Sequence, residues 1–168
     1  VCSSDLWAGQ MNRQSFRLAY KYASAFFNLY GKSFTDQDFW NIKKAVSAID
    51  ENRSILSFME WAESGKNSGI VSVFLKRFDL HSDLGKLLIL LKKQKRVLLI
   101  PDILRCILNL YLKRSDKLYF ELQSYPKLSD SQEDDIVKFL AGVSKKEVLY
   151  FSKENPELIA GLKAQSTE

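Results

Sequence analysis

Apolar side chains in the first two thirds of the chain recur three and four positions apart, the period of helices with one buried face. This spacing predicts a helix from Phe16 to Tyr30, which Gly31 ends. Thr35-Asp36-Gln37-Asp38 has the form of a capping box, so a second helix is expected from there to Ile49. Further helices are predicted over residues 55–61, 70–78, 84–95 and 100–111. Six helices with short connections predict a helical bundle.

The pattern changes after the sixth predicted helix. Residues 117–123 alternate between apolar and polar side chains, which is the period of a strand, and Pro126 ends this strand. Ser129-Asp130-Ser131-Gln132 is a second capping box, and it opens a helix that ends at Gly142. Residues 148–151 predict a second strand.

The fold class predicted from these elements is mainly α, with two domains. Residues 158–162 are a candidate partner for the second strand across the Asn155-Pro156 turn, which completes a small α+β unit. We therefore expect a six-helix bundle over residues 11–115 and an α+β domain over residues 116–168. Residues 1–10 precede a plausible start at Met11 and match no pattern in the rest, so they are interpreted as a non-native or disordered extension.

The charge of the chain is unevenly distributed. Residues 1–115 contain 18 Lys+Arg and 10 Asp+Glu, a net of +8, whereas residues 116–168 contain 7 and 10, a net of −3. A basic first part suits nucleic acid, anionic lipid or an acidic protein segment, or it is a solvated lysine-rich surface. The best candidate for a membrane helix, Val97–Leu112, is interrupted by Pro101, Asp102 and Arg105, so no membrane span is predicted.

The densest apolar run comprises Leu84 and residues 87–91, which point nearly all round the predicted helix. A helix on the outside of a bundle cannot bury that many side chains against its neighbours alone. The surplus side is therefore either the centre of the bundle or a groove for another helix. Pro101 is placed for the first turn of the next helix. Between the two helices lie cations suited to the negative end of a helix dipole, namely Lys92, Lys93, Lys95 and Arg96.

Four segments, taken in order, carry a resemblance to a known family. They are Lys21–Phe26, the Leu-rich run with Arg96 and Ile100-Pro101-x-Ile103, Ser124–Ser129, and Asn155–Leu162. Together they resemble the delta subunit of bacterial ATP synthases, the homologue of the mitochondrial oligomycin-sensitivity-conferring protein. In that family the first, third and fourth segments read Arg-Tyr-Ala-x-Ala-Leu, Ser-Ala-x-x-Leu-Ser and Asp-Pro-Ser-Leu-Ile-Gly-Gly, and the second spans the fifth and sixth helices. The signature positions matched here are Tyr22, Ala25, Arg96, Pro101, Asn155, Pro156 and Gly161.

The sequence also departs from the family pattern. Lys21 replaces the usual Arg, Ala160 replaces the first Gly of the last signature, and Ala164 stands where a branched apolar residue is usual. The family continues through a further hairpin strand and an Asp-Gly-Ser segment into a final helix. The C-terminal domain is therefore expected to be incomplete in this chain.

The resemblance implies a non-enzymatic subunit of the peripheral stalk, or stator, of a proton-driven rotary ATP synthase. It implies two partners: the amphipathic N-terminal helix of an alpha subunit of the catalytic head, and the C-terminus of the b subunits. It implies no cofactor and no nucleic acid. It places the protein at the cytoplasmic face of the bacterial inner membrane, which it reaches only through the complex. The residues implicated in the alpha-subunit groove, between the first and fifth helices, are Tyr20, Ala23, Phe27, Leu84, Leu87, Leu88 and Leu91.

A helical enzyme with an unrecognised site is one rival interpretation, and the candidate catalytic residues give it little support. His81, the one histidine, lies in a predicted loop without a cysteine or second histidine to complete a metal site. Asp36-x-Asp38 and Asp134-Asp135 fall in first turns of predicted helices, where the dipole stabilises negative charge. Cys106 lies in an apolar run and is predicted to be buried.

A basic helical nucleic-acid-binding adaptor is the other rival. The basic corner between the fifth and sixth helices suits a phosphate backbone, but nucleic-acid-binding domains usually add a recognition helix or an aromatic stacking platform.

Cys2 and Cys106 lie far apart in the sequence, and two cysteines without an evident partner weakly favour a reducing compartment.

Overall fold

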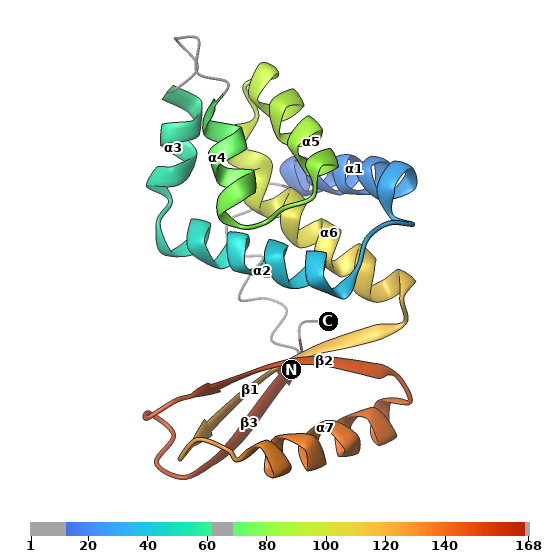
Figure 1. The fold of residues 1–168 in the computed structure, drawn as a ribbon, viewed down its shortest axis with the longest axis vertical. Helices are drawn as coiled ribbons and strands as arrows, with labels where there is room; N and C mark the ends of the chain where they lie inside the picture. The colour runs from blue at the N-terminus through green and yellow to red at the C-terminus, as the bar shows by residue number, and fades with distance from the viewer. Residues whose placement is uncertain (1–12, 62–68, 167–168) are drawn as a thin grey trace. The chain divides into compact units, whose positions relative to one another are not determined.

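A computed structural model describes residues 13–61 and 69–166, so the predictions for residues 1–10 lie outside the described part of the chain. The described residues form a mainly helical structure with a small three-stranded sheet (Figure 1). They divide into two compact units, a helical unit that ends at Tyr111 and a second unit that begins at Leu112. None of the described helices is both long and apolar enough to span a bilayer.

The helices expected before Lys117 are present in the described residues. They are α1 (Arg13–Tyr30), α2 (Asp36–Glu51), α3 (Ser54–Trp61), α4 (Gly69–Arg77), α5 (Ser82–Lys93) and α6 (Ile100–Arg114), with a 3₁₀ turn, η3 (Val97–Leu99), between the last two. The Thr35 side chain accepts a hydrogen bond from the Asp38 N–H, which confirms the predicted capping box of α2. α5 is capped by His81, because His81 Nδ1 accepts a hydrogen bond from the Asp83 N–H at 3.3 Å.

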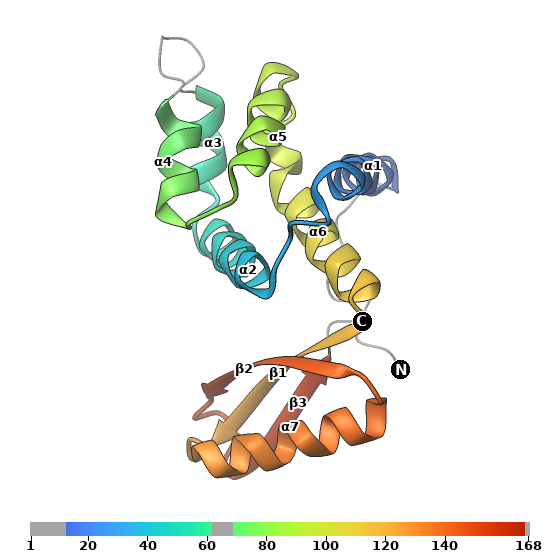
Figure 2. The ribbon, with the colours of Figure 1, turned by 45° about the vertical axis from the view of Figure 1, so that its right-hand side comes forward.

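The core of the helical unit is centred on α6, which passes close to α1, α2 and α5 (Figures 1 and 2). The ring of Tyr111 in α6 packs against Phe34 and Phe39, with ring centres 5.0 and 5.9 Å apart. On the same helix Arg105 forms ion pairs with Asp50 of α2 and with Asp102. The core includes the buried side chains of Phe26, Val46, Leu88, Ile103 and Ile107.

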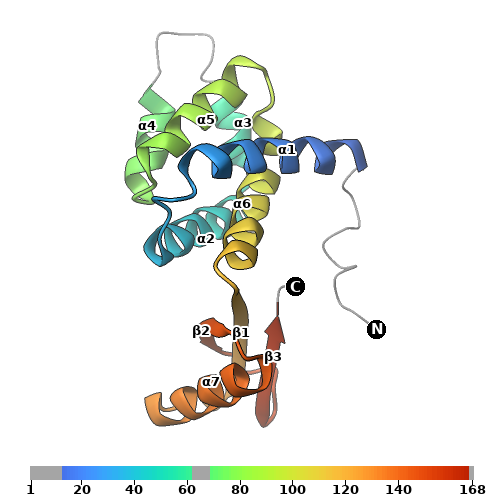
Figure 3. The same ribbon diagram turned by 90° about the vertical axis from the view of Figure 1, so that its right-hand side faces the viewer.

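The second unit has the order β1 (Lys117–Tyr125), α7 (Asp130–Ser144), β2 (Glu147–Glu154) and β3 (Gly161–Ser166). β1 lies in the centre of the sheet, parallel to β2 and antiparallel to β3. Parallel neighbours need a crossover, and α7 supplies it, lying against one face of the sheet (Figures 1 and 3). The Ser129 capping box of α7 is confirmed.

One strand pairing was predicted incorrectly. Residues 158–162 were expected to pair with the second strand, but β3 begins at Gly161 and pairs with β1 instead. The reason lies in the turn before β3. The Asn155 N–H donates to the Ser124 carbonyl at 2.9 Å, and the Asn155 side-chain amide donates to Gln123 Oε1 at 2.8 Å. These bonds anchor the turn on the end of β1, so the chain crosses β1 and does not fold back on β2.

Candidate partner-binding surface

α1 and α5 lie side by side in opposite directions, and polar contacts near the two ends of α5 join it to α1 (Figure 3). In the middle of α1 the Tyr22 hydroxyl donates to Gln94 Oε1 and accepts from Arg96 Nη1 at 2.7 Å, and both partners lie just after α5. At the end of α1, the Lys86 ammonium of α5 lies 5.5 Å from the centre of the Tyr30 ring. Tyr22 and Arg96 are both signature positions, 74 residues apart in sequence, so two of the matched segments meet in the fold.

The structure separates the apolar run of α5 into interior and surface side chains. Leu84, Leu87, Leu88 and Leu91 are buried, whereas Ile89 and Leu90 are 44% and 42% exposed. The buried four follow the helical repeat and share one face, while Ile89 and Leu90 fall outside it. The bundle centre thus accounts for most of the leucine excess, and a smaller exposed part remains.

An exposed apolar strip lies where α1 borders α5. Leu18, Tyr22, Ala25 and Leu29 recur at helical spacing, so they form one stripe, and Tyr22 of this stripe reaches the end of α5. Ala25 is exposed and Leu29 is 74% exposed. On α5 the matching stripe contains Leu87 and Leu90, and it continues to Gln94, the partner of Tyr22. We call this strip the α1–α5 seam, defined by Leu18, Ala25, Leu29 and Leu90, with the buried Leu87 at its border.

The seven residues implicated in an alpha-subunit groove occupy a different surface from this seam. Ala23, Phe27, Leu84, Leu87, Leu88 and Leu91 are buried, and only Leu87 borders the seam. Tyr20 is 48% exposed, but it lies two positions from both Leu18 and Tyr22 and therefore on the opposite flank of α1. Most of these side chains therefore fill the core of the helical unit, because they occupy the inward-facing helical positions.

Sequence reasoning missed Leu18, Leu29 and Leu90 as surface candidates. Their helical spacing was readable, but the direction of each stripe depends on where the neighbouring helix lies. That information came from the Tyr22, Gln94 and Arg96 contacts.

The remaining signature positions have structural roles. Pro101 lies buried in the first turn of α6. Backbone N–H groups in the first turn have no acceptor within the helix, so the N–H that proline lacks costs no helical hydrogen bond. The Asn155 side-chain oxygen accepts from the Glu157 N–H at 3.0 Å, so this residue orders the turn that contains Pro156. Gly161 has a φ of 130°, a conformation that strongly favours glycine, at the start of β3. The second unit thus uses its signature to set the path from β2 to β3.

The candidate catalytic residues form no reactive constellation. His81 caps α5 and lies 3.3 Å from the Asp83 carboxylate. Burial raises the pKa of the Cys106 thiol to about 11, so the thiol stays protonated and unreactive at neutral pH. Asp36 and Asp38 lie in the first turn of α2, as expected. Among residues 13–61 and 69–166, no group of three or more acidic, histidine or cysteine side chains is placed to hold a metal ion.

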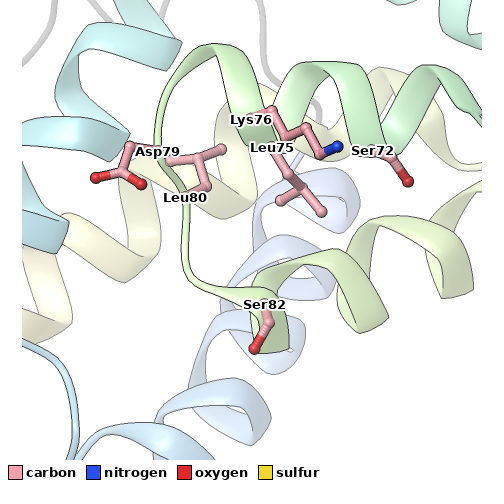
Figure 4. A pocket seen from close by; sticks show the side chains of 6 residues that line it. All are labelled: Ser72, Leu75, Lys76, Asp79, Leu80 and Ser82. Carbon is pink, nitrogen blue, oxygen red and sulfur yellow. The ribbon is translucent and has the colours of Figure 1, made fainter.

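A surface pocket lies where α4 ends and α5 begins (Figure 4). In Figure 4 the Lys76 ammonium and the Asp79 carboxylate point in opposite directions, so these two charged groups do not converge on one position. The pocket therefore lacks the convergent polar groups of an active site. Its lining residues are Ser72, Leu75, Lys76, Asp79, Leu80 and Ser82.

The chain is similar to known proteins both in sequence and in fold. The sequence model of the ATP synthase delta (OSCP) subunit family matches residues 18–168. The chain belongs to this family. A chain in the cryo-EM structure of the Toxoplasma gondii mitochondrial ATP synthase hexamer has a similar fold, with a TM-score of 0.63 and 14% sequence identity over 88% of this chain and 83% of that chain. No curated protein sequence matches. The family match confirms the resemblance seen in the four segments.

Proposed function

We propose that this chain is a non-catalytic stator subunit in the peripheral stalk of a rotary ATP synthase. Family membership supports this role. A stator joins the catalytic head to the stalk and resists the torque of the rotor, so that proton flow drives conformational change in the head. Such a joint needs tight, stiff contacts. It reaches the membrane only through the complex, on the side that carries the catalytic head.

The helical unit, in this proposal, binds the amphipathic N-terminal helix of an alpha subunit along the α1–α5 seam. The observation that carries the proposal is an exposed apolar strip on two helices that polar contacts join at two places. A helix laid along two neighbouring helices buries its apolar stripe against both of them. Leu29 and Leu90 are the exposed leucines that such a partner would cover.

Titration calorimetry with the full chain and the N-terminal peptide of the alpha subunit from the same organism tests this proposal. Leu90→Asp places a charge within the seam and should abolish measurable binding. Ile89→Asp is the matched control, because Ile89 is the next residue on α5 and is equally exposed, on the shoulder away from α1. Circular dichroism should show equal helicity in both variants, since neither side chain is buried. Equal binding by both variants, or no binding by the unmodified chain, would contradict the seam as the docking surface.

The second unit, in this proposal, binds the C-terminus of the b subunits through α7. Phe139 and Val143 lie one turn apart on α7 and are 68% and 69% exposed. Phe139→Asp should therefore weaken binding of a peptide taken from the C-terminus of the b subunits. Phe151→Asp is the control: Phe151 follows Tyr150, which faces α7 beside Glu133, so Phe151 points to the opposite face of the sheet. If Phe151→Asp alone disrupts binding, the other face of the sheet is the contact surface.

A further inference from the structure

The two helices that form the α1–α5 seam carry an unusual charge. α1 contains no Asp or Glu along its length, and α5 contains only Asp83. Their cations gather where the first half of α1 approaches the end of α5, since Tyr22 in the middle of α1 contacts Arg96 just after α5. The cations at this end are Arg17, Lys21, Lys92, Lys93, Lys95 and Arg96.

The stability of the fold explains only part of this cluster. Lys92 and Lys93 lie in the last turn of α5, where a positive charge is favourable beside the helix dipole. Arg17 and Lys21 lie in the first half of α1, far from its C-terminal turn, so the helix dipole does not stabilise their positive charges. The first turn of α1 also holds no carboxylate that could offset them. Arg96 donates to the Tyr22 hydroxyl and to Gln94 Oε1, and neither acceptor is a carboxylate. Within the described residues, no ion pair neutralises any cation of this cluster.

The cations of the cluster flank the apolar strip directly. Lys21 lies three residues after Leu18 and four before Ala25, so it is the outer neighbour of both on the α1 surface. Lys93 lies three residues after Leu90 and has the same relation to it on α5. Both lysines are exposed. At this end of the seam, the apolar side chains therefore lie between a lysine on α1 and a lysine on α5.

The other end of the seam is close to neutral. There Lys86 Nζ lies 2.7 Å from Asp83 Oδ1 and sits over the Tyr30 ring, so its charge is matched within the fold. The positive charge along the seam thus falls from the end of α5 towards its start. Among the described side chains of α1 and α5, the cations without an ion-pair partner therefore lie at one end of the seam.

We propose that the partner of the α1–α5 seam is an amphipathic helix whose carboxylates are concentrated towards one end, and that this acidic end lies between Lys21 and Lys93. This inference rests on the proposed function, and it adds the charge and the orientation of the bound helix. Apolar contacts with Leu29 and Leu90 hold the helix, and the charge gradient selects one of its two antiparallel orientations. A nucleic acid would use the cations but leave the apolar strip uncovered, so the structure favours the helix.

The test uses the full chain and the N-terminal peptide of the alpha subunit from the same organism, with binding measured by titration calorimetry. Lys21→Gln and Lys93→Gln should each weaken binding about two- to fivefold, the range of exposed ion pairs. The control is Lys44→Gln, because Lys44 is exposed on α2 outside the seam, and it should leave affinity unchanged. Added salt should weaken binding by the unmodified chain and have less effect on the double lysine variant.

Orientation is tested with two peptide variants, in which the Asp and Glu residues of either the first or the second half are changed to Asn and Gln. Neutralising one half should weaken binding, and with that peptide Lys21→Gln and Lys93→Gln should cause no further loss of affinity. Neutralising the other half should change the affinity little. Equal effects of the two halves, no effect of either, or a partner segment without carboxylates would overturn the inference while leaving the docking proposal intact. Loss of all peptide binding to the unmodified chain would instead overturn the proposed function. Equally tight binding of a short DNA duplex at the same salt would show that the cations serve a different partner.

Discussion

Leu88 and Leu90 lie two residues apart on α5, and the structure assigns them opposite roles. Leu88 is 2% exposed within the core, whereas Leu90 is 42% exposed in the α1–α5 seam. Leu88→Ala removes about three methylene equivalents from the interior, which at about 0.8 kcal/mol each costs about 2.4 kcal/mol in transfer free energy. The cavity left behind raises the loss of unfolding free energy to about 3–5 kcal/mol. For the helical unit this corresponds to a fall in melting temperature of roughly 12 °C or more.

Leu90→Ala is the matched control for this prediction. Nearly half of the Leu90 side chain is already in water, so its truncation should cost about 1 kcal/mol or less, and alanine is as good a helix former as leucine. Urea unfolding of the full chain, followed by far-ultraviolet circular dichroism, measures both losses. In the peptide titration the order should reverse, with Leu90→Ala losing affinity and folded Leu88→Ala keeping it. Equal destabilisation by the two variants would refute the assignment of Leu88 to the core and Leu90 to the surface.

Two further predictions concern the glycines and the buried thiol. Gly31→Ala should lower stability by about 1–3 kcal/mol, because an added Cβ would overlap the Phe27 carbonyl and ring, whereas Gly142→Ala meets no atom within 4 Å and should gain up to about 1 kcal/mol in a thermal melt. Cys106 has a folded pKa raised by burial from 9.0 to about 11, so its contribution to stability is present below pH 9 and is lost as the pH rises through 11. Cys106→Ala should therefore flatten the fall in stability between pH 9 and 11 by about 2 kcal/mol. An unchanged slope in that window would show that other groups titrate there.

The sequence by itself determined the elements of this protein, because helices, strands and caps depend on local interactions. Helical spacing located α1, α2 and α6, and the capping boxes at Thr35 and Ser129 marked helix starts through side-chain to backbone bonds within four residues. Alternation located β1. The family was also readable from short segments, since each of those segments serves a local turn, a helix start or a single contact.

Only the tertiary structure decided which apolar side chains are core and which are surface. Leu88 and Leu90 have the same chemistry, and their burial differs because the rest of the helical unit covers one side of α5 and leaves the other open. The strand partner of β3 was likewise undetermined, because the choice between β2 and β1 rests on bonds from Asn155 to the distant end of β1. The α1–α5 seam exists for the same reason. Its position depends on contacts between Tyr22 and Arg96, and a local pattern carries no information about which distant residue a side chain will meet.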